Sequence, residues 1–236
     1  MKILYLVPTL LSENMLPEKM LAPKVIEVIH SLQQFIVEDV RTARRFLSKA
    51  KHPVPIEHLQ FRELNEHTPE KEIASLLPYL LNADTGVMSE AGVPGIADPG
   101  AAIVSLAHTN GIKVIPLIGP SSIFLALMAS GLNGQSFSFV GYLPVKRDER
   151  QKRLKELERS SNSEKKAQIF IETPYRNTQL LNDIVQCCRP ETLLAIAADI
   201  TGENEFIKTR SIKQWKVNLP ELNKIPTVFI LQASWQ

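Results

Sequence analysis

The sequence has no glycine in its first 85 residues and only two cysteines among its 236 residues. The two cysteines, Cys187 and Cys188, are neighbours, and this spacing matches neither a C-x-x-C redox motif nor a zinc site. We therefore expect two reduced thiols in a cytoplasmic protein. The five histidines also fall at no metal-ligand spacing, so the sequence predicts no bound metal.

Several catalytic motifs are missing as well. The chain contains no P-loop, no G-x-G-x-x-G, no H-E-x-x-H and no G-x-S-x-G. Nothing in it suggests a Ser/His/Asp triad. These absences favour chemistry that a bound cofactor supplies, for which the protein mainly provides position.

Neither a strong net charge nor a clear membrane span is present. A net charge of +2, with 22% charged and 44% apolar residues, is ordinary for a soluble globular protein. Residues 114–132 carry no charge, but Pro116, Gly119 and Pro120 interrupt them, which predicts a buried strand, a loop and a buried helix. We therefore expect no association with a membrane.

Short apolar runs alternate along the chain with segments of helical periodicity. This alternation predicts an α/β fold with largely parallel sheets. The expected strands are 3–7, 35–38, 85–89, 113–118, 137–141, 168–172, 193–198 and 226–233. The expected helices include 23–34, 41–49, 70–81, 100–111, 121–130 and 176–188. A chain of this length can form two domains of about 100–120 residues, and we expect two α/β domains, at 1–115 and 116–236.

The glycines that do occur are concentrated in one stretch, where four lie between residues 86 and 100. Within it, "SEAGVPGIADPG" (89–100) follows an expected strand, at the end where open α/β sheets place ligands. Ser121 and Ser122 follow the next strand, at the start of an expected helix whose free N–H groups suit a carboxylate or another polar ligand group. Taken alone, Ser121 is better explained as a helix cap and Gly119 as a turn.

Taken together, several ordered segments resemble the tetrapyrrole methylase superfamily. They are "SEAGVPGIADPG" (89–100), "PLIGPSSIFLALMASGL" (116–132), "FSFVGYLPVKRDERQKRLKEL" (137–157) and "IETPYR" (171–176). In addition, "VEDVRTARRFL" (37–47) resembles the E-D-T-R segment of the branch that methylates the 2′-hydroxyl of a cytidine in small-subunit ribosomal RNA. The whole set matches that branch best.

The resemblance implies two α/β domains with an S-adenosylmethionine (SAM) cleft between them. It further implies a ribosomal RNA acceptor and a homodimer. It also implies that the Gly-x-Pro turn, the serine pair and the end of a strand in the second domain bind the cofactor. In this sequence those residues are Ala91, Gly92, Val93, Pro94, Ile96, Ser121, Ser122, Ala126, Glu172, Thr173 and Pro174. The missing side chain at Gly92 would let the backbone meet the cofactor directly.

The sequence departs from that branch in several places. "VPTLLSEN" (7–14) keeps Pro8 of the usual T-P-I-G-N-L but has no glycine, and "AADITGEN" (197–204) lacks the arginine and lysine of R-E-L-T-K. Glu90 replaces an aspartate, Val93 a threonine and Tyr175 a histidine. Two alternatives therefore stay open: methylation of a small molecule such as a tetrapyrrole, and a non-catalytic relative that binds SAM or RNA.

Methylation of a hydroxyl needs a group that removes or stabilises the proton of the acceptor. The candidates are Glu38, Asp39, Arg41 and Glu90, although Asp39 and Arg41 can also form an ion pair at a helix start. Between residues 146 and 166, nine Lys/Arg face five Asp/Glu. Helical spacing places Lys146, Arg150 and Arg153 on one face, and this segment is either a solvated helix or a surface that binds RNA.

Overall fold

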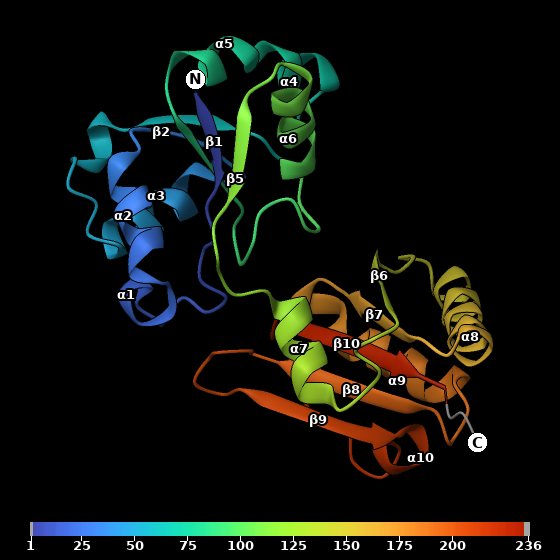
Figure 1. Cartoon of the computed structure of the whole chain (residues 1–236). Coiled ribbons are helices and arrows are strands. Elements are labelled where there is room, and N and C mark those ends of the chain that lie inside the picture. Colours follow the sequence, from blue (N-terminus) through green and yellow to red (C-terminus); the bar gives the residue numbers. More distant parts are fainter. Residues whose placement is uncertain (1, 234–236) are drawn as a thin grey trace. The chain divides into compact units, whose positions relative to one another are not determined.

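The computed structural model describes residues 2–233, which form two compact units, Met1–Ser121 and Ser122–Gln236 (Figure 1). Each unit is a three-layer arrangement of helices on both faces of a five-stranded sheet. The boundary that we predict from the sequence, after residue 115, lies inside the strand β5 (Lys113–Pro116). The structure divides instead after Ser121, at the start of the helix α7 (Ser122–Ser130).

The sheet of the first unit is entirely parallel, as the alternation of strands and helices predicts. Its strands are β1 (Ile3–Leu6), β2 (Gln34–Val37), β3 (Gln60–Glu63), β4 (Thr85–Met88) and β5, in the order β3-β2-β4-β1-β5. Because all strands run the same way, their carboxyl ends lie at one edge of the sheet. The loops that follow β1, β4 and β5 therefore start side by side.

Helices cover both faces of this sheet. On one face lie α1 (Pro17–Met20), α2 (Pro23–Ser31) and α3 (Val40–Lys49), and on the other α4 (Glu70–Ser75), α5 (Leu77–Asn82) and α6 (Gly100–Thr109) (Figure 1). A 3-10 turn, Ile56–His58, precedes β3. The single helix expected at 70–81 is broken into α4 and α5 because Pro78, in the first turn of α5, has no N–H to continue the helix.

The sheet of the second unit is mixed, and here the expectation of largely parallel sheets is wrong. Its strands are β6 (Phe137–Tyr142), β7 (Ala167–Ile171), β8 (Leu193–Ala198), β9 (Phe206–Ser211) and β10 (Thr227–Gln232), in the order β6-β7-β10-β8-β9. Only β6 and β7 pair in parallel, whereas β10 is antiparallel to both β7 and β8, and β8 is antiparallel to β9. The direct loop between β8 and β9 contains no crossover helix, which an antiparallel pair does not need.

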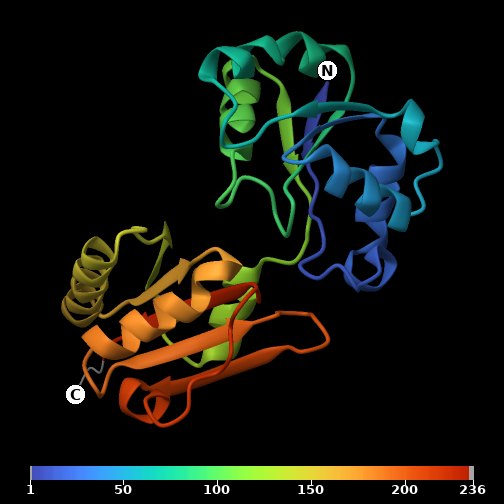
Figure 2. The same cartoon turned by 180° about the vertical axis from the view of Figure 1, so that it is seen from behind.

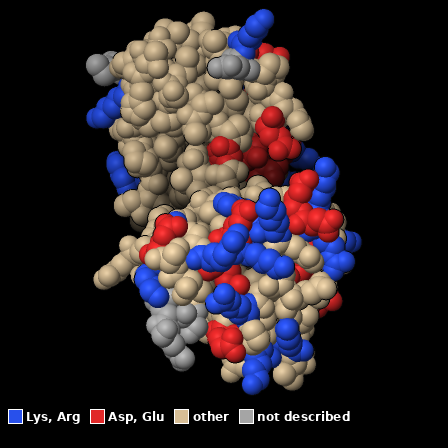
Figure 3. All heavy atoms as spheres, turned by 90° about the vertical axis from the view of Figure 1, so that its right-hand side faces the viewer, with Lys and Arg blue, Asp and Glu red and all other residues tan. Residues whose placement is uncertain are grey.

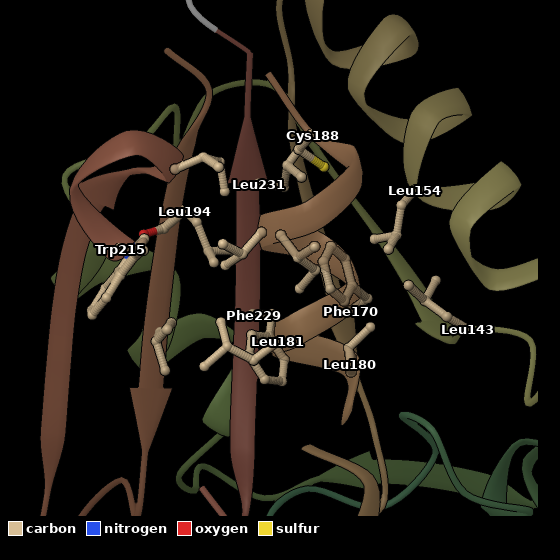
Figure 4. Packing of buried hydrophobic residues seen from close by; sticks show 14 of the residues in the cluster. Leu143, Leu154, Phe170, Leu180, Leu181, Cys188, Leu194, Trp215, Phe229 and Leu231 are labelled. Atoms are coloured by element: carbon tan, nitrogen blue, oxygen red, sulfur yellow. The ribbon is translucent and has the colours of Figure 1, made fainter. Parts of the chain in front are cut away.

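The second sheet also has helices on both faces. The helices α8 (Arg147–Glu164), α9 (Asn177–Cys187) and α10 (Ile212–Trp215) share one core with it, and a 3-10 turn, Pro174–Arg176, precedes α9. In Figure 2, α9 lies in front of the sheet and α7 behind it. Figure 4 shows this core, in which the rings of Phe170 and Phe229 stack at 5.9 Å and the Trp215 indole N–H donates to the Leu194 carbonyl at 2.9 Å.

Two strands escape prediction because both are polar edge strands. The sequences of β3, "QFRE", and β9, "FIKTRS", contain no continuous apolar run, and each strand has a neighbour on one side only. The stretch 114–132 forms β5, a loop and α7, but β5 is a half-exposed edge strand, and Phe124 and Met128 of α7 are exposed. Within residues 2–233, no helix is both long and apolar enough to cross a membrane.

Candidate functional site

Three loops are tied together at the carboxyl edge of the first sheet. The backbone N–H of Thr9, after β1, donates to the carbonyl of Gly92, after β4, at 2.8 Å. The hydroxyl of Thr9 lies 3.4 Å from the same carbonyl and from that of Ser89. A Cβ placed on Gly119, after β5, would overlap the ring of Pro8, so glycine lets these two loops touch. This edge therefore presents one interlocked set of loops.

Gly92 is required for a different reason from the one that the sequence suggests. Its φ is +79°, and an added Cβ would lie 3.1 Å from Leu11 Cδ2 and 3.3 Å from the Pro120 carbonyl oxygen. The space beside Gly92 is thus filled by the protein's own neighbouring loops. The contact between the Gly92 backbone and the cofactor stays a prediction.

The same loop is braced by Asp98, which sequence reasoning did not single out. Its carboxylate accepts hydrogen bonds from the backbone N–H groups of Gly95, at 2.9 Å, and Gly100, at 2.6 Å. Burial raises the pKa of Asp98, although these backbone hydrogen bonds act in the opposite direction. The sequence does contain a signal for this role, because an aspartate in a glycine-rich loop commonly accepts hydrogen bonds from the backbone N–H groups of that loop.

The remaining cofactor candidates of this loop differ in exposure. Pro94 is buried and Val93 half-buried, whereas Ala91 and Ile96 are exposed, Ile96 with 50% of its surface. A ligand at this loop would therefore meet Ala91 and Ile96 first.

Carboxylates gather next to the loop, at the ends of β2 and β4. A small pocket there is lined by Glu38, Ser89 and Asp98 together with apolar strand residues. The half-buried Glu38 accepts the backbone N–H of Glu90 at 3.2 Å. Burial raises the pKa of Glu38, and the nearby carboxylates of Glu90, Asp98 and Glu66 raise it further. Glu38 is therefore a better proton acceptor than an ordinary surface glutamate.

Asp39 and Arg41, the other two catalytic candidates, lie at the start of α3. Asp39 caps α3, because its Oδ1 accepts the N–H of Thr42 at 2.6 Å, and this hydrogen bonding lowers the pKa of Asp39. Arg41 is exposed, and within residues 2–233 it makes no ion pair. The ion pair considered between them is not formed, and Asp39 caps a helix. Of the predicted catalytic candidates, only Glu38 lines the pocket, and Glu90 contacts it through its backbone N–H.

The serine pair lies at the boundary of the two units, with Ser121 at the end of the first and Ser122 at the start of the second. Ser121 and Ser122 are half-exposed at the N-terminus of α7, and neither hydroxyl has a hydrogen-bond partner among the described residues. The free hydroxyls and the helix N-terminus suit an anionic ligand group. Ala126 is different, since it packs on the buried side of α7 with no exposed surface. It therefore supports the helix and offers no surface to a ligand.

Glu172 lies at the end of β7 with a buried carboxylate. Its Oε1 accepts the N–H of Thr173 at 2.6 Å and Nη2 of Arg176 at 2.6 Å. Its Oε2 is buried and has no hydrogen-bond partner among the described residues. The same is true of Nε of Arg176 and of the hydroxyl of Thr201, which lies in the loop after β8. Since buried polar atoms are normally hydrogen-bonded, these atoms have unused capacity for a polar ligand group. Thr173 and Pro174 are half-buried beside them.

The basic face predicted for α8 is wrong at Arg150. Arg150 is only 1% exposed, and its Nε and Nη2 donate to Asp183 of α9 at 2.8 and 2.5 Å. It also donates to the carbonyl of Val145 at 2.6 Å. Because Leu154 and Leu157 share its side of the helix, Arg150 is a buried structural residue and does not face RNA. Lys146 and Arg153 are exposed, and each lies 3.4 Å from a glutamate, Glu149 and Glu156 respectively.

The sequence matches a known family over most of its length. The model of Tetrapyrrole (Corrin/Porphyrin) Methylases matches residues 17–215. The chain is 32% identical over 207 residues to a ribosomal RNA small subunit methyltransferase I from Vibrio cholerae serotype O1, covering 87% of this chain and 67% of that protein. It is 29% identical over 185 residues to the protein of that name from Synechocystis, covering 78% and 63%. The chain thus spans about two thirds of the length of these curated relatives.

Solved structures show the same fold at low sequence identity. The methyltransferase CobJ superposes with a TM-score of 0.64 at 17% identity, covering 99% of this chain and 94% of that one. The uroporphyrin-III-C-methyltransferase from Thermus thermophilus superposes with a TM-score of 0.56, also at 17% identity, covering 98% and 94%. These likenesses establish a fold of two α/β units.

Proposed function

Because the chain belongs to the tetrapyrrole methylase family, we propose that it is a SAM-dependent methyltransferase whose acceptor is a ribose 2′-hydroxyl of small-subunit ribosomal RNA. The observation that carries the proposal is the 32% identity, across 87% of this chain, to a relative named for methylation of that RNA. The tetrapyrrole enzymes resemble the chain only in fold.

Candidate cofactor-binding groups lie at three places along the chain. At the first, Ala91, Val93 and Ile96 form the accessible side of a loop that Gly92 and Pro94 hold in shape. At the second place, the N-terminus of α7, the free hydroxyls of Ser121 and Ser122 would hold a carboxylate. The uncommitted Oε2 of Glu172, beside Thr173 and Pro174, would accept a hydrogen bond. When bound, SAM supplies a methyl group on a positively charged sulfur.

The acceptor hydroxyl must lose its proton as it is methylated, and Glu38 is the group best placed to take it. Its half-buried carboxylate lies at the carboxyl edge of the first sheet and accepts a hydrogen bond from the N–H of Glu90. Its raised pKa makes it a stronger base than an exposed glutamate. Glu90 fixes its orientation through the backbone.

We further propose a cytoplasmic location, where the ribosomal acceptor is found, and a homodimer. The homodimer is supported by the family resemblance and by the exposed apolar residues Phe124 and Met128, which lie four positions apart on α7. Light scattering of the purified chain measures the oligomeric state. A monomer at micromolar concentration would contradict the homodimer without bearing on catalysis.

The proposed activity is tested with SAM labelled in its methyl group and three acceptors. These are small ribosomal subunits from a strain that lacks the ribose mark, protein-free RNA from those subunits, and a uroporphyrinogen. Transfer to either RNA sample supports the proposal. Transfer to the tetrapyrrole alone would replace it with small-molecule methylation. Binding of SAM with no transfer to any acceptor would favour a non-catalytic relative.

A further inference from the structure

The exposed side of α8 carries basic residues of two kinds. Lys146 and Arg153 each lie beside a glutamate of the same helix, and Arg147 donates to the buried Asp183 at 3.0 Å. Lys152, Lys155 and Arg159 are also exposed, but no acidic partner lies within 4.0 Å of them among residues 2–233. We call these three residues the outer stripe.

The outer stripe lies on one side of the helix. Its members are three and four positions apart, a spacing that aligns side chains along an α-helix. The buried side, formed by Arg150, Leu154, Leu157, Glu158 and Ser161, faces the opposite way. From Lys152 to Arg159 the stripe extends about 10 Å along the helix axis, at about 1.5 Å for each residue.

The stripe continues onto the loop between α9 and β8. A cavity there is lined by Arg159 and Asn162 of α8 and by Arg189 and Thr192 of the loop. Two carboxylates also line it. Glu158 is buried and already accepts the N–H of Arg189 at 2.8 Å and the hydroxyl of Thr192 at 2.5 Å, whereas Glu191 is exposed. The guanidinium of Arg189 has no ion-pair partner among the described residues.

Figure 3 shows the face of the second unit on which Lys and Arg side chains gather, with Asp and Glu between them. Where a cation already neighbours a carboxylate, its charge is largely compensated. Where it does not, the positive potential extends into solvent and attracts a polyanion. The free cations, and not the total charge of the helix, therefore decide where phosphates bind.

We propose that the outer stripe and Arg189 bind the phosphate backbone of the RNA acceptor. This inference rests on the proposed function, since it assigns the surface through which the second unit holds that acceptor. This surface replaces the one predicted from the sequence, which consisted of Lys146, Arg150 and Arg153. In the structure Arg150 is buried, and Lys146 and Arg153 each lie beside a glutamate. Phosphate contacts of this kind give affinity without reading sequence.

The test compares two double variants of the same helix that remove the same charge. Lys155→Gln/Arg159→Gln removes free cations, and Lys146→Gln/Arg153→Gln removes paired ones. Fluorescence anisotropy measures the affinity of each for a single-stranded fragment of small-subunit ribosomal RNA between 0.05 and 0.3 M KCl. Each lost phosphate contact should reduce the slope of log K against log salt by about 0.7. The first variant should thus lose about 1.4 in slope and bind about 25-fold more weakly at 0.1 M salt.

The second variant should keep the wild-type slope and bind within about 3-fold of wild type, and both should bind SAM as wild type does. Equal losses in the two variants, or an unchanged slope in the first, would overturn the proposed surface. If the wild type methylates RNA and the first variant binds it normally, only this inference fails. If the wild type neither binds nor methylates RNA, both the surface and the proposed function are wrong. Binding that depends on the stripe, without methyl transfer, would support the surface and contradict the function.

Discussion

The backbone N–H of Thr9 donates to the carbonyl of Gly92 across 2.8 Å, and this hydrogen bond joins the loop after β1 to the loop after β4. The two residues are far apart in sequence and meet because β1 and β4 are parallel neighbours. The hydrogen bond holds the Gly92 turn next to the loop after β1, at the carboxyl edge of the sheet. The position of Ala91 and Ile96 thus depends on the loop at 8–14.

Gly92→Ala should destabilise the protein by about 1–2 kcal/mol and weaken SAM binding, because alanine resists a φ of +79° and its Cβ would press on Leu11 and Pro120. Gly95→Ala is the matched control, since its φ is +87° but no atom lies within 4 Å of an added Cβ. Thermal unfolding and calorimetric titration with SAM measure both effects. Equal SAM affinities in the two variants would show that packing at Gly92 does not position the cofactor loop.

Breaking the buried pair between Arg150 and Asp183 should be severe. Arg150→Met leaves Asp183, which is 1% exposed, with Arg147 and Gln151 on Oδ1 and no donor on Oδ2, and breaking a buried ion pair costs up to about 3–5 kcal/mol. Burial alone would raise the pKa of Asp183, but hydrogen bonds from Arg150, Gln151 and Arg147 hold it below its usual value. Urea unfolding of Arg150→Met, Asp183→Leu and the double variant gives the interaction free energy between the two side chains. If each single variant is as stable as wild type, the assignment of Arg150 as a structural residue is wrong.

Asp39→Ala should lower stability by about 1 kcal/mol through loss of the α3 cap, with little effect on methyl transfer. The pKa of Asp39 is lowered by its hydrogen bonds to Thr42, so its contribution is present above the unfolded pKa, near 3.8, and is lost as pH falls through the folded value. Unfolding measured between pH 3 and pH 7 should show the wild type and the variant converging at the acidic end. A large loss of activity at unchanged stability would instead place Asp39 in catalysis.

Glu38→Gln should remove most methyl transfer, about 100-fold or more, because glutamine accepts the Glu90 N–H but cannot take a proton. In the wild type, activity should fall as pH drops through a midpoint above the ordinary glutamate pKa of 4.5, since the folded-state pKa is raised. The same shift makes the charged form unfavourable in the folded state. Stability from this group is therefore present at low pH and lost as pH rises through the raised pKa.

The stability of Glu38→Gln at neutral pH should consequently equal or exceed that of wild type. Glu90→Gln is the control, because its backbone N–H, not its side chain, contacts Glu38. Rates measured with saturating SAM across pH 4 to pH 9 separate the roles. An unaltered rate in Glu38→Gln would remove Glu38 from the chemistry.

Most of the fold could be predicted from the sequence because buried strands and amphipathic helices leave periodic patterns. The runs at 35–38 and 193–198 are central strands with apolar neighbours on both faces, and they were found. By contrast, β3 and β9 are polar because each is exposed at a sheet edge, so no apolar run marks them. The direction of β10 depends on its pairing with both β7 and β8, which no local pattern encodes.

The candidate site was predictable only in part. The motifs located the loops after β4 and β5, but they did not show that Gly92 is packed by Leu11 and Pro120. Helical spacing put Arg150 on the same face as Lys146, although it points into the core to meet Asp183, more than thirty residues later in the chain. Spacing along one helix cannot reveal which side is covered, because the covering residues come from another element.

We propose above that this chain transfers a methyl group from SAM to a ribose of small-subunit ribosomal RNA. The most direct measurement incubates the purified chain and SAM with small subunits that lack the mark, digests the RNA to nucleosides and identifies the product by mass spectrometry. The account predicts a 2′-O-methylated nucleoside that is absent from the reaction with Glu38→Gln. A methylated base, or unmodified RNA under conditions in which SAM binds, would contradict it.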